Sequence, residues 1–176
     1  LVFLLTSFEW FRMTKNKDLL RIFGLFFLFL SFFSTIYLRQ YIGLNFFLFL
    51  IIICIFTDTG GYIFGKTFKG PKLIKISPNK TYSGMIGSFI LPVIAAWLYS
   101  QYQNSLSFEL FNIKKNNLSF FLIILFISAI CQVGDLVISF FKRSAKLKDT
   151  GKLIPGHGGL LDRIDGIIFA IPVSYL

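Results

Sequence analysis

Four aspartates in or beside the apolar stretches of the sequence are the residues best suited to chemistry. Asp58 and Asp135 lie within such stretches, and Asp162 and Asp165 stand at the start of the last one. An ionisable side chain inside a membrane span is costly and usually marks a functional site. Asp162 and Asp165 are three residues apart, which on a helix places both carboxylates on one face. Together with Asp135 they predict an oxygen-rich site for Mg²⁺, which binds a few carboxylates along with water and substrate phosphates.

Structural alternatives stay open for two of these acids. Asp58 is followed by Thr59, Gly60 and Gly61, so its side chain could simply cap or break a helix. Asp135 could form a structural salt bridge to a neighbouring helix. The spacing alone does not separate these roles from a catalytic one.

A dense run of cations precedes the last pair of acids. It consists of Lys142, Arg143, Lys146, Lys148 and Lys152. Carboxylates, a metal ion and Lys or Arg in one place suit phosphate chemistry, because several negative charges must be brought together and stabilised. The sequence therefore predicts that phosphate groups bind near this run.

A glycine-rich linker joins the cations to the acids. It reads Pro155, Gly156, His157, Gly158 and Gly159. Glycines let a backbone approach a ligand closely, and amide groups at a helix start favour anions. The linker could thus line the phosphate site, or it could be a flexible turn in which His157 is a plain polar residue.

A second polar patch runs from Ile76 to Gly84, just before another apolar stretch. Its proline and glycine indicate a tight turn. The side chains of Ser77, Lys80 and Thr81 could all contact phosphate, which makes them candidate binding residues.

Long apolar blocks must position these groups. The chain has 176 residues, of which 55% are hydrophobic and 24 are Phe. Blocks near the length of about 20 residues that a helix needs to cross a bilayer core are Leu19–Leu38, Leu44–Phe64, Gly84–Tyr102 and Leu118–Phe141. Leu1–Phe8 and Ile167–Leu176 look like partial spans. Because helices satisfy their own backbone hydrogen bonds in lipid, we expect an all-α integral membrane protein, a polytopic bundle of about five to six transmembrane segments. Residues 1–176 would form a single domain.

The net charge of +10 is distributed unevenly among the loops. Segments 9–21, 65–82 and 142–163 are rich in Lys and Arg, and the loops between them are poor. When successive helices cross the membrane in opposite directions, the positive-inside rule predicts that loops rich and poor in Lys and Arg alternate along the chain. These three segments are therefore predicted to face the cytoplasm, and 103–117 the opposite side. This distribution argues against nucleic acid as a partner. The scattered lysines could instead serve only to set the topology and to attract anionic lipid.

The segment from Ser139 to Asp165 is similar to the signature of the phosphatidate cytidylyltransferases, also called CDP-diacylglycerol synthases. That signature reads Ser-x-apolar-Lys-Arg, then Lys-Asp, then His-Gly-Gly, then Asp-Arg-x-Asp, and every fixed position is met here. Asp58–Tyr62 and Ser77–Thr81 also resemble the family, in the same order. The resemblance covers residues 9–176, without the family's N-terminal helices and part of its last one. It departs at Asn79, where the family usually has Lys, and at Ser83, where it usually has Glu.

The resemblance implies the reaction of CTP with phosphatidate to give CDP-diacylglycerol and pyrophosphate, in phospholipid biosynthesis. It implies a multi-pass protein of the bacterial inner membrane, with an active site that faces the cytoplasm. Mg²⁺ would be the cofactor; a second ion, K⁺ or Mg²⁺, and a homodimer are left open. Catalysis would consist mostly of positioning and electrostatic stabilisation.

The resemblance also implies roles for individual residues. Asp135, Asp162 and Asp165 would hold the metal. The catalytic set would comprise Lys142, Arg143, Lys148, Asp149, His157, Asp162 and Asp165, with the cations neutralising phosphate. The role of Asp149, toward a lysine or toward cytosine or ribose, stays open. Phosphate would be bound by Ser77, Lys80, Thr81, Gly158, Gly159 and Arg163. Asp58 would complete the polar cavity.

Two other functions remain as alternatives. A CTP-dependent kinase, or a cytidylyltransferase for another lipid phosphate or alcohol, would carry a similar cluster. A small transporter coupled to cations or protons could use Asp58 and Asp135. It would not need phosphate-binding cations concentrated on one side.

Overall fold

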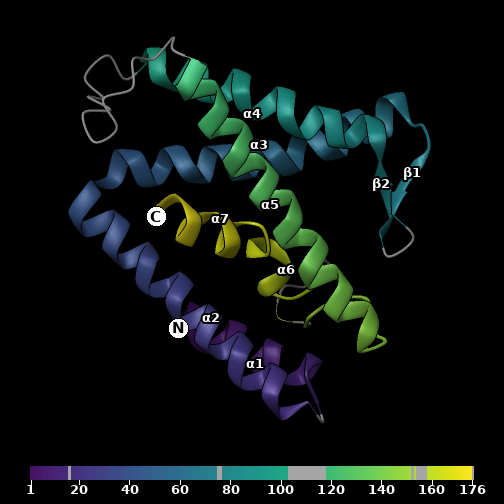
Figure 1. The fold of residues 1–176 in the computed structure, drawn as a ribbon. Helices are drawn as coiled ribbons and strands as arrows, with labels where there is room; N and C mark the ends of the chain where they lie inside the picture. The colour runs from purple at the N-terminus through teal and green to yellow at the C-terminus, as the bar shows by residue number, and fades with distance from the viewer. Residues whose placement is uncertain (16, 75–76, 103–117, 152, 154–157, 176) are drawn as a thin grey trace.

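The computed structural model describes residues 1–15, 17–74, 77–102, 118–151, 153 and 158–175 (Figure 1). In chain order the elements are α1 (Val2–Met13), α2 (Asp18–Tyr37), η1 (Leu38–Ile42), α3 (Leu44–Phe68), β1 (Lys72–Ile74), β2 (Ser77–Thr81), α4 (Tyr82–Tyr102), α5 (Leu118–Ser144), α6 (Leu161–Ile164) and α7 (Ile167–Tyr175). Over these residues the fold is a helix bundle with one small hairpin.

Among the described residues, four helices are long and apolar enough to cross a membrane. They are Asp18–Ile42, Leu44–Phe68, Tyr82–Gln101 and Leu118–Ser144. The four predicted spans are thereby confirmed, and the protein is an all-α, multi-pass membrane protein. Their outer faces are apolar too, since Phe23, Phe26 and Phe33 of α2 are all exposed. A large exposed apolar surface is unusual on a soluble protein and suits contact with lipid.

The first span turns sharply into the second at Gly43. α2 continues into the π-helical turn η1, which ends where Gly43 adopts a φ of +112°. This region of backbone conformation strongly favours glycine, which has no Cβ. The break allows two consecutive apolar runs to form two separate helices.

α3 and α4 pack tightly side by side (Figure 1). A Cβ on Gly60 of α3 would collide with the backbone carbonyl of Gly87 in α4. Small residues allow helix backbones in membranes to approach closely in this way. The contact fixes the start of α4, and the hairpin before it, against the half of α3 that carries Asp58.

Two apolar clusters fill the bundle. One lies among α3, α4, α5 and α7 and includes Leu50, Ile53, Ile124 and Ala170. The other joins α1 and α2 to α5, α6 and α7, and includes Trp10, Leu28, Ile138, Leu161 and Ile168. As a result α7 packs against α2, α3 and α5 and closes the space between them (Figure 1).

The ends and the hairpin differ from the sequence expectation. The first partial span continues past Phe8 to Met13 as α1. The last one, expected at Ile167–Leu176, forms α7, and the separate short helix α6 precedes it. The segment expected to be a turn before α4 is strand β2, which pairs antiparallel with β1 through Lys72 and Thr81 and through Ile74 and Ser77. The hairpin extends from the adjoining ends of α3 and α4 (Figure 1).

Candidate active site

A cavity of about 360 Å³ lies where α3, the hairpin, α4, α5 and α6 meet. Its lining residues are Asp58, Gly61, Tyr62, Leu73, Ser77, Lys80, Thr81, Gly84, Met85, Ser88, Gln132, Asp135, Asp162, Arg163 and Asp165. The cavity thus unites the two intramembrane aspartates with both polar patches. Eight of the candidate site residues line it: Asp58, Ser77, Lys80, Thr81, Asp135, Asp162, Arg163 and Asp165.

The α5 carboxylate of Asp135 forms an ion pair within this cavity. Its Oδ2 lies 2.5 Å from Nζ of Lys80 on β2. Its Oδ1 accepts a hydrogen bond of 3.2 Å from the hydroxyl of Ser139, one helical turn further along α5. The salt bridge considered as a structural alternative does form, but its partner is a cation that itself lines the cavity.

Asp165, in the connection between α6 and α7, is buried beside Asp135. Its side chain is 7% exposed, and its Oδ1 accepts a 2.9 Å hydrogen bond from the amide of Gly166. Burial raises the pKa of Asp165, and the charges of Asp135 and Asp58 raise it further. The carboxylates therefore repel one another, which makes the cavity favourable for a cation.

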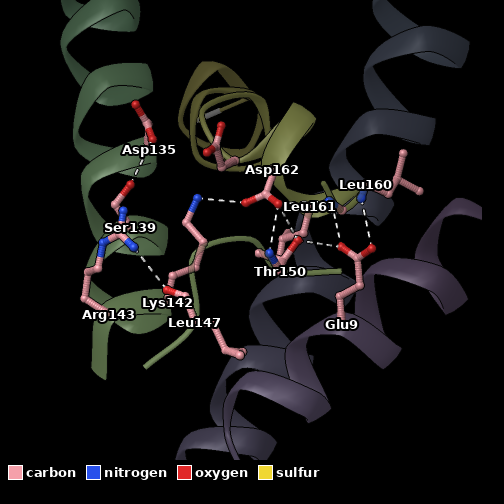
Figure 2. A network of polar contacts seen from close by, with 12 residues as sticks. Glu9, Asp135, Ser139, Lys142, Arg143, Leu147, Thr150, Leu160, Leu161 and Asp162 are labelled. Carbon is pink, nitrogen blue, oxygen red and sulfur yellow. Dashed lines mark hydrogen bonds and ion pairs between the residues drawn. The ribbon is translucent and has the colours of Figure 1, made fainter. Parts of the chain in front are cut away.

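Asp162 lines the same cavity but directs its oxygens toward protein donors (Figure 2). Oδ1 accepts a 2.7 Å hydrogen bond from Nζ of Lys142, and both side chains are nearly buried. Oδ2 accepts hydrogen bonds from the amides of Thr150, at 2.8 Å, and Gly159, at 2.9 Å. Burial acts to raise the pKa of Asp162, but these donors outweigh it and hold the pKa below the ordinary 3.8. The carboxylate is consequently ionised and ties the 150–159 loop to α5.

The first helix contributes an acid that the sequence analysis did not single out. Glu9 of α1 is 1% exposed and lies on the far side of Thr150 from Asp162 (Figure 2). The amides of Leu160 and Leu161 donate to it, and so does the Thr150 hydroxyl. The one available signal was a lone glutamate in a short apolar segment at the N-terminus, which gives no indication of its partners 141 to 152 residues later.

The hairpin residues have mixed roles. Ser77 and Lys80 line the cavity from β2. The hydroxyl of Thr81 accepts a 3.1 Å hydrogen bond from the amide of Gly84, and so caps the start of α4 while it lines the cavity. Ser83 donates a hydrogen bond to the carbonyl of Lys69 and closes the hairpin end.

The remaining candidates lie around the cavity rather than in it. Arg143 is exposed and donates a 3.2 Å hydrogen bond to the carbonyl of Leu147, just beyond the end of α5 (Figure 2). Lys148 and Asp149 are also exposed. Gly158, at a φ of +87°, passes so close to Asp149 and Asp162 that a Cβ would crowd them, and Gly159 is buried. His157 lies outside the described residues. Catalytic roles for Arg143, Lys148 and Asp149 therefore stay predictions.

The donor set bears on the predicted magnesium site. Within the described residues, no three Asp, Glu, His or Cys side chains converge closely enough to hold one ion. Mg²⁺, however, often uses only one or two carboxylates and completes its shell with water and substrate phosphates. Asp135 and Asp165, which line the cavity together with Asp58, fit that pattern. Asp162 fits it less well, because Lys142 and two amides already occupy its oxygens.

Comparison with known proteins gives consistent matches. The model of the cytidylyltransferase family matches residues 1–176. A phosphatidate cytidylyltransferase of Rickettsia conorii is 37% identical over 172 residues, which are 96% of this chain and 73% of that protein. One from Staphylococcus saprophyticus is 41% identical over 142 residues, 80% of this chain and 52% of the relative. One from Haemophilus influenzae is 37% identical over 133 residues, which are 75% of this chain and 45% of the relative. The chain thus spans about half the length of the last two relatives.

Proposed function

The chain belongs to the cytidylyltransferase family, and on that premise we propose that it is a phosphatidate cytidylyltransferase, which converts CTP and phosphatidate into CDP-diacylglycerol and pyrophosphate. The observation that carries the proposal is the cavity in which Asp58, Asp135 and Asp165 meet Lys80. Relatives that bear this enzyme's name match the segments that supply those residues. Grouped carboxylates with a cation beside them are what metal-assisted phosphate chemistry requires.

The reaction would proceed by one displacement at phosphorus. A phosphate oxygen of phosphatidate forms a bond to the α-phosphorus of CTP, and the bond from that phosphorus to the oxygen bridging to the β-phosphate breaks. Pyrophosphate leaves with the bonding electrons. The nucleophile is already anionic near neutral pH, so no strong general base is needed. The main obstacle is repulsion between the two phosphorylated substrates, which positioning and electrostatic stabilisation can overcome.

The residues of the cavity divide that task. Asp135 and Asp165, supported by Asp58, would hold Mg²⁺, which supplies positive charge to the phosphates when bound. Lys80 neutralises Asp135 in the free protein at 2.5 Å and is near enough to the cavity to contact a phosphate instead. Arg163 adds a second cation to the lining.

Gln132 is a further candidate for contact with substrate. It lines the cavity, and its Nε2 is buried without a hydrogen-bond partner among the described residues. A buried polar group without a partner is unfavourable unless a ligand or water satisfies it. We propose that this amide donates to a substrate oxygen.

We further propose that the cavity opens toward the cytoplasm, in the inner membrane of a bacterium. The two cation-rich segments predicted to be cytoplasmic, 65–82 and 142–163, both contribute side chains to this cavity. Their meeting at one site supports a common side of the membrane. CTP would then reach the cavity from water, and phosphatidate from the bilayer.

The direct test is turnover by the purified protein in detergent or vesicles. CTP, Mg²⁺ and phosphatidate should yield CDP-diacylglycerol and pyrophosphate in equal amounts, and Asp165→Asn should abolish both products. A CTP-dependent kinase would release CDP and a phosphorylated lipid without pyrophosphate, and an enzyme for another lipid phosphate would ignore phosphatidate. Either result, or ion flux without nucleotide chemistry, would contradict the proposal. The longer Staphylococcus saprophyticus relative serves as the positive control.

A further inference from the structure

Glu9 is a buried acid that the proposed reaction does not use. It lies on α1, the helix farthest in sequence from the acids of the cavity, and its side chain is 1% exposed. Burial of a carboxylate is costly unless hydrogen bonds replace its lost water. Glu9 has such bonds, and among the described residues they come from Thr150, Leu160 and Leu161.

Both carboxylate oxygens of Glu9 accept backbone hydrogen bonds. Oε1 lies 2.9 Å from the amide nitrogen of Leu160, and Oε2 lies 2.8 Å from that of Leu161. Leu161 is the first residue of α6, and Asp162 is the second. Glu9 therefore holds the backbone from which the Asp162 side chain projects.

Thr150 links Glu9 to Asp162 directly (Figure 2). Its hydroxyl oxygen lies 2.9 Å from Oε2 of Glu9 and 3.0 Å from Oδ2 of Asp162. A hydroxyl carries a single proton and donates it to one of the two carboxylates at a time. Thr150 also donates its backbone amide to Asp162 at 2.8 Å, so one residue contacts both acids.

Two glycines leave room for the Glu9 carboxylate. A Cβ on Gly151 would collide with Oε1 of Glu9, and a Cβ on Gly159 would collide with the Thr150 hydroxyl and crowd Oε2 of Glu9. The backbone of the loop therefore passes directly over the acid. Such close approach is available only to glycine, and it indicates a built site rather than a chance contact.

We propose that Glu9 is a positioning residue for the candidate active site. It fixes Thr150 and the start of α6, and through them the carboxylate of Asp162 and the Lys142 ammonium bound to it. For its effect on turnover the inference rests on the proposed function. Displacement of reacting groups by about 1 Å can reduce catalysis by roughly a hundredfold, so a residue outside the cavity can still control the rate.

The test compares Glu9→Gln with a matched control. In Glu9→Gln the NH₂ group of the glutamine would face the backbone amide of Leu160 or Leu161, so that two donors oppose each other. The control, Ser31→Ala, removes a different buried hydrogen bond, which Ser31 on α2 donates to the carbonyl of Ile168 at 2.9 Å. We expect Glu9→Gln to lower kcat per folded protein by at least about tenfold, with KM for CTP within about threefold because Glu9 does not touch the cavity. Glu9→Asp, which keeps the charge, should fall between Glu9→Gln and the parent. Ser31→Ala should keep its kcat.

A second readout does not depend on turnover. Amide hydrogen exchange over residues 158–162 should be at least about tenfold faster in Glu9→Gln, because two amides lose a charged acceptor, and unchanged in Ser31→Ala. If Glu9→Gln does not fold, Thr150→Val takes its place, since it removes only the bridging hydroxyl and should lower kcat in the same direction. Unchanged exchange, or a kcat within twofold of the parent, would overturn the inference. If the parent itself does not turn over CTP and phosphatidate, the proposed function fails while the exchange measurement still decides the role of Glu9.

Discussion

At the scale of single residues, the aspartates of the cavity differ in what surrounds them. Asp135 and Asp165 line the same cavity as Asp58, with Lys80 as the cation beside Asp135. Asp162 is surrounded by donors from Lys142 and the loop backbone. An aspartate can therefore bind a metal ion at one position and hold a loop at another, because only lone pairs that accept no hydrogen bond from the protein remain free to bind a ligand.

This difference predicts distinct behaviour for two asparagine variants. Asp165→Asn should lower turnover by at least about a hundredfold, as loss of one preorganised charged group does, and should raise the Mg²⁺ concentration needed for half-maximal rate. Asp162→Asn should also lower turnover, but its Mg²⁺ dependence should stay that of the parent, since its main loss is the bond to Lys142. Titration of the rate with Mg²⁺ separates the two. If the Mg²⁺ concentration for half-maximal rate rises equally in both variants, Asp162 also binds the metal, as the sequence alone predicts.

Lys80 offers a second residue-scale prediction. Lys80→Met leaves Asp135 without the cation at 2.5 Å and removes a candidate phosphate contact, so kcat/KM for CTP should fall by at least about tenfold, or about 1.4 kcal/mol of transition-state stabilisation. Lys72→Met is the matched control, because it removes the same charge from the exposed side of the same hairpin. Equal small effects in the two variants would mean that Lys80 only sets membrane topology.

Residue types alone predict much of the cavity but not its pairings. Asp58 and Asp135 could be singled out because charges are rare within apolar runs, and Lys80 because it lies in a polar patch that could contact phosphate. The pair of Lys80 with Asp135 could not be predicted, since it joins the hairpin to a helix 55 positions later. Glu9 could not be predicted either, because its acceptor role depends on where the 150–161 loop folds back.

At the scale of elements, the long spans follow from composition because a helix in lipid needs only length and apolarity. The hairpin and the division between α6 and α7 depend on tertiary contacts instead. β2 contains Pro78 and Asn79, which strands generally avoid, and it is held by pairing with β1 and by the Thr81 cap on α4. Local sequence therefore favoured a turn where the structure has a strand.

The α3–α4 contact supports a prediction at this scale. Gly60→Val would place a side chain against the Gly87 carbonyl and push apart the helices that carry Asp58 and the base of the hairpin. Overpacking of this kind typically costs about 1–3 kcal/mol, so thermal stability in detergent and turnover should both fall. Ile63→Phe adds volume to the same helix at a residue that is 45% exposed and should leave both unchanged. A stable, active Gly60→Val protein would show that the site does not need the close contact between the α3 and α4 backbones.

At the scale of the whole molecule, two segments predicted to be cytoplasmic meet in one cavity, and that requires an even number of crossings between them. Among the described residues, α4 and α5 are the two spans that separate the hairpin from the loop between α5 and α6. We therefore predict that the hairpin and that loop lie on one side of the membrane, and that the connection at 103–117 lies on the other. This connection is outside the described residues, so its side is a prediction from the charge pattern and from the span count.

Cysteine labelling tests that arrangement for the whole chain. Cys54 and Cys131 are free and buried, and their replacement by alanine would leave a background without thiols, to be checked first for unchanged turnover. In that background Lys114→Cys should react with an impermeant maleimide added outside intact cells. Lys146→Cys, at an exposed position after α5, should react only in inside-out vesicles. If both thiols react from the same side, the crossing order is wrong, and a cavity built from α3, the hairpin and α6 could not face a single compartment.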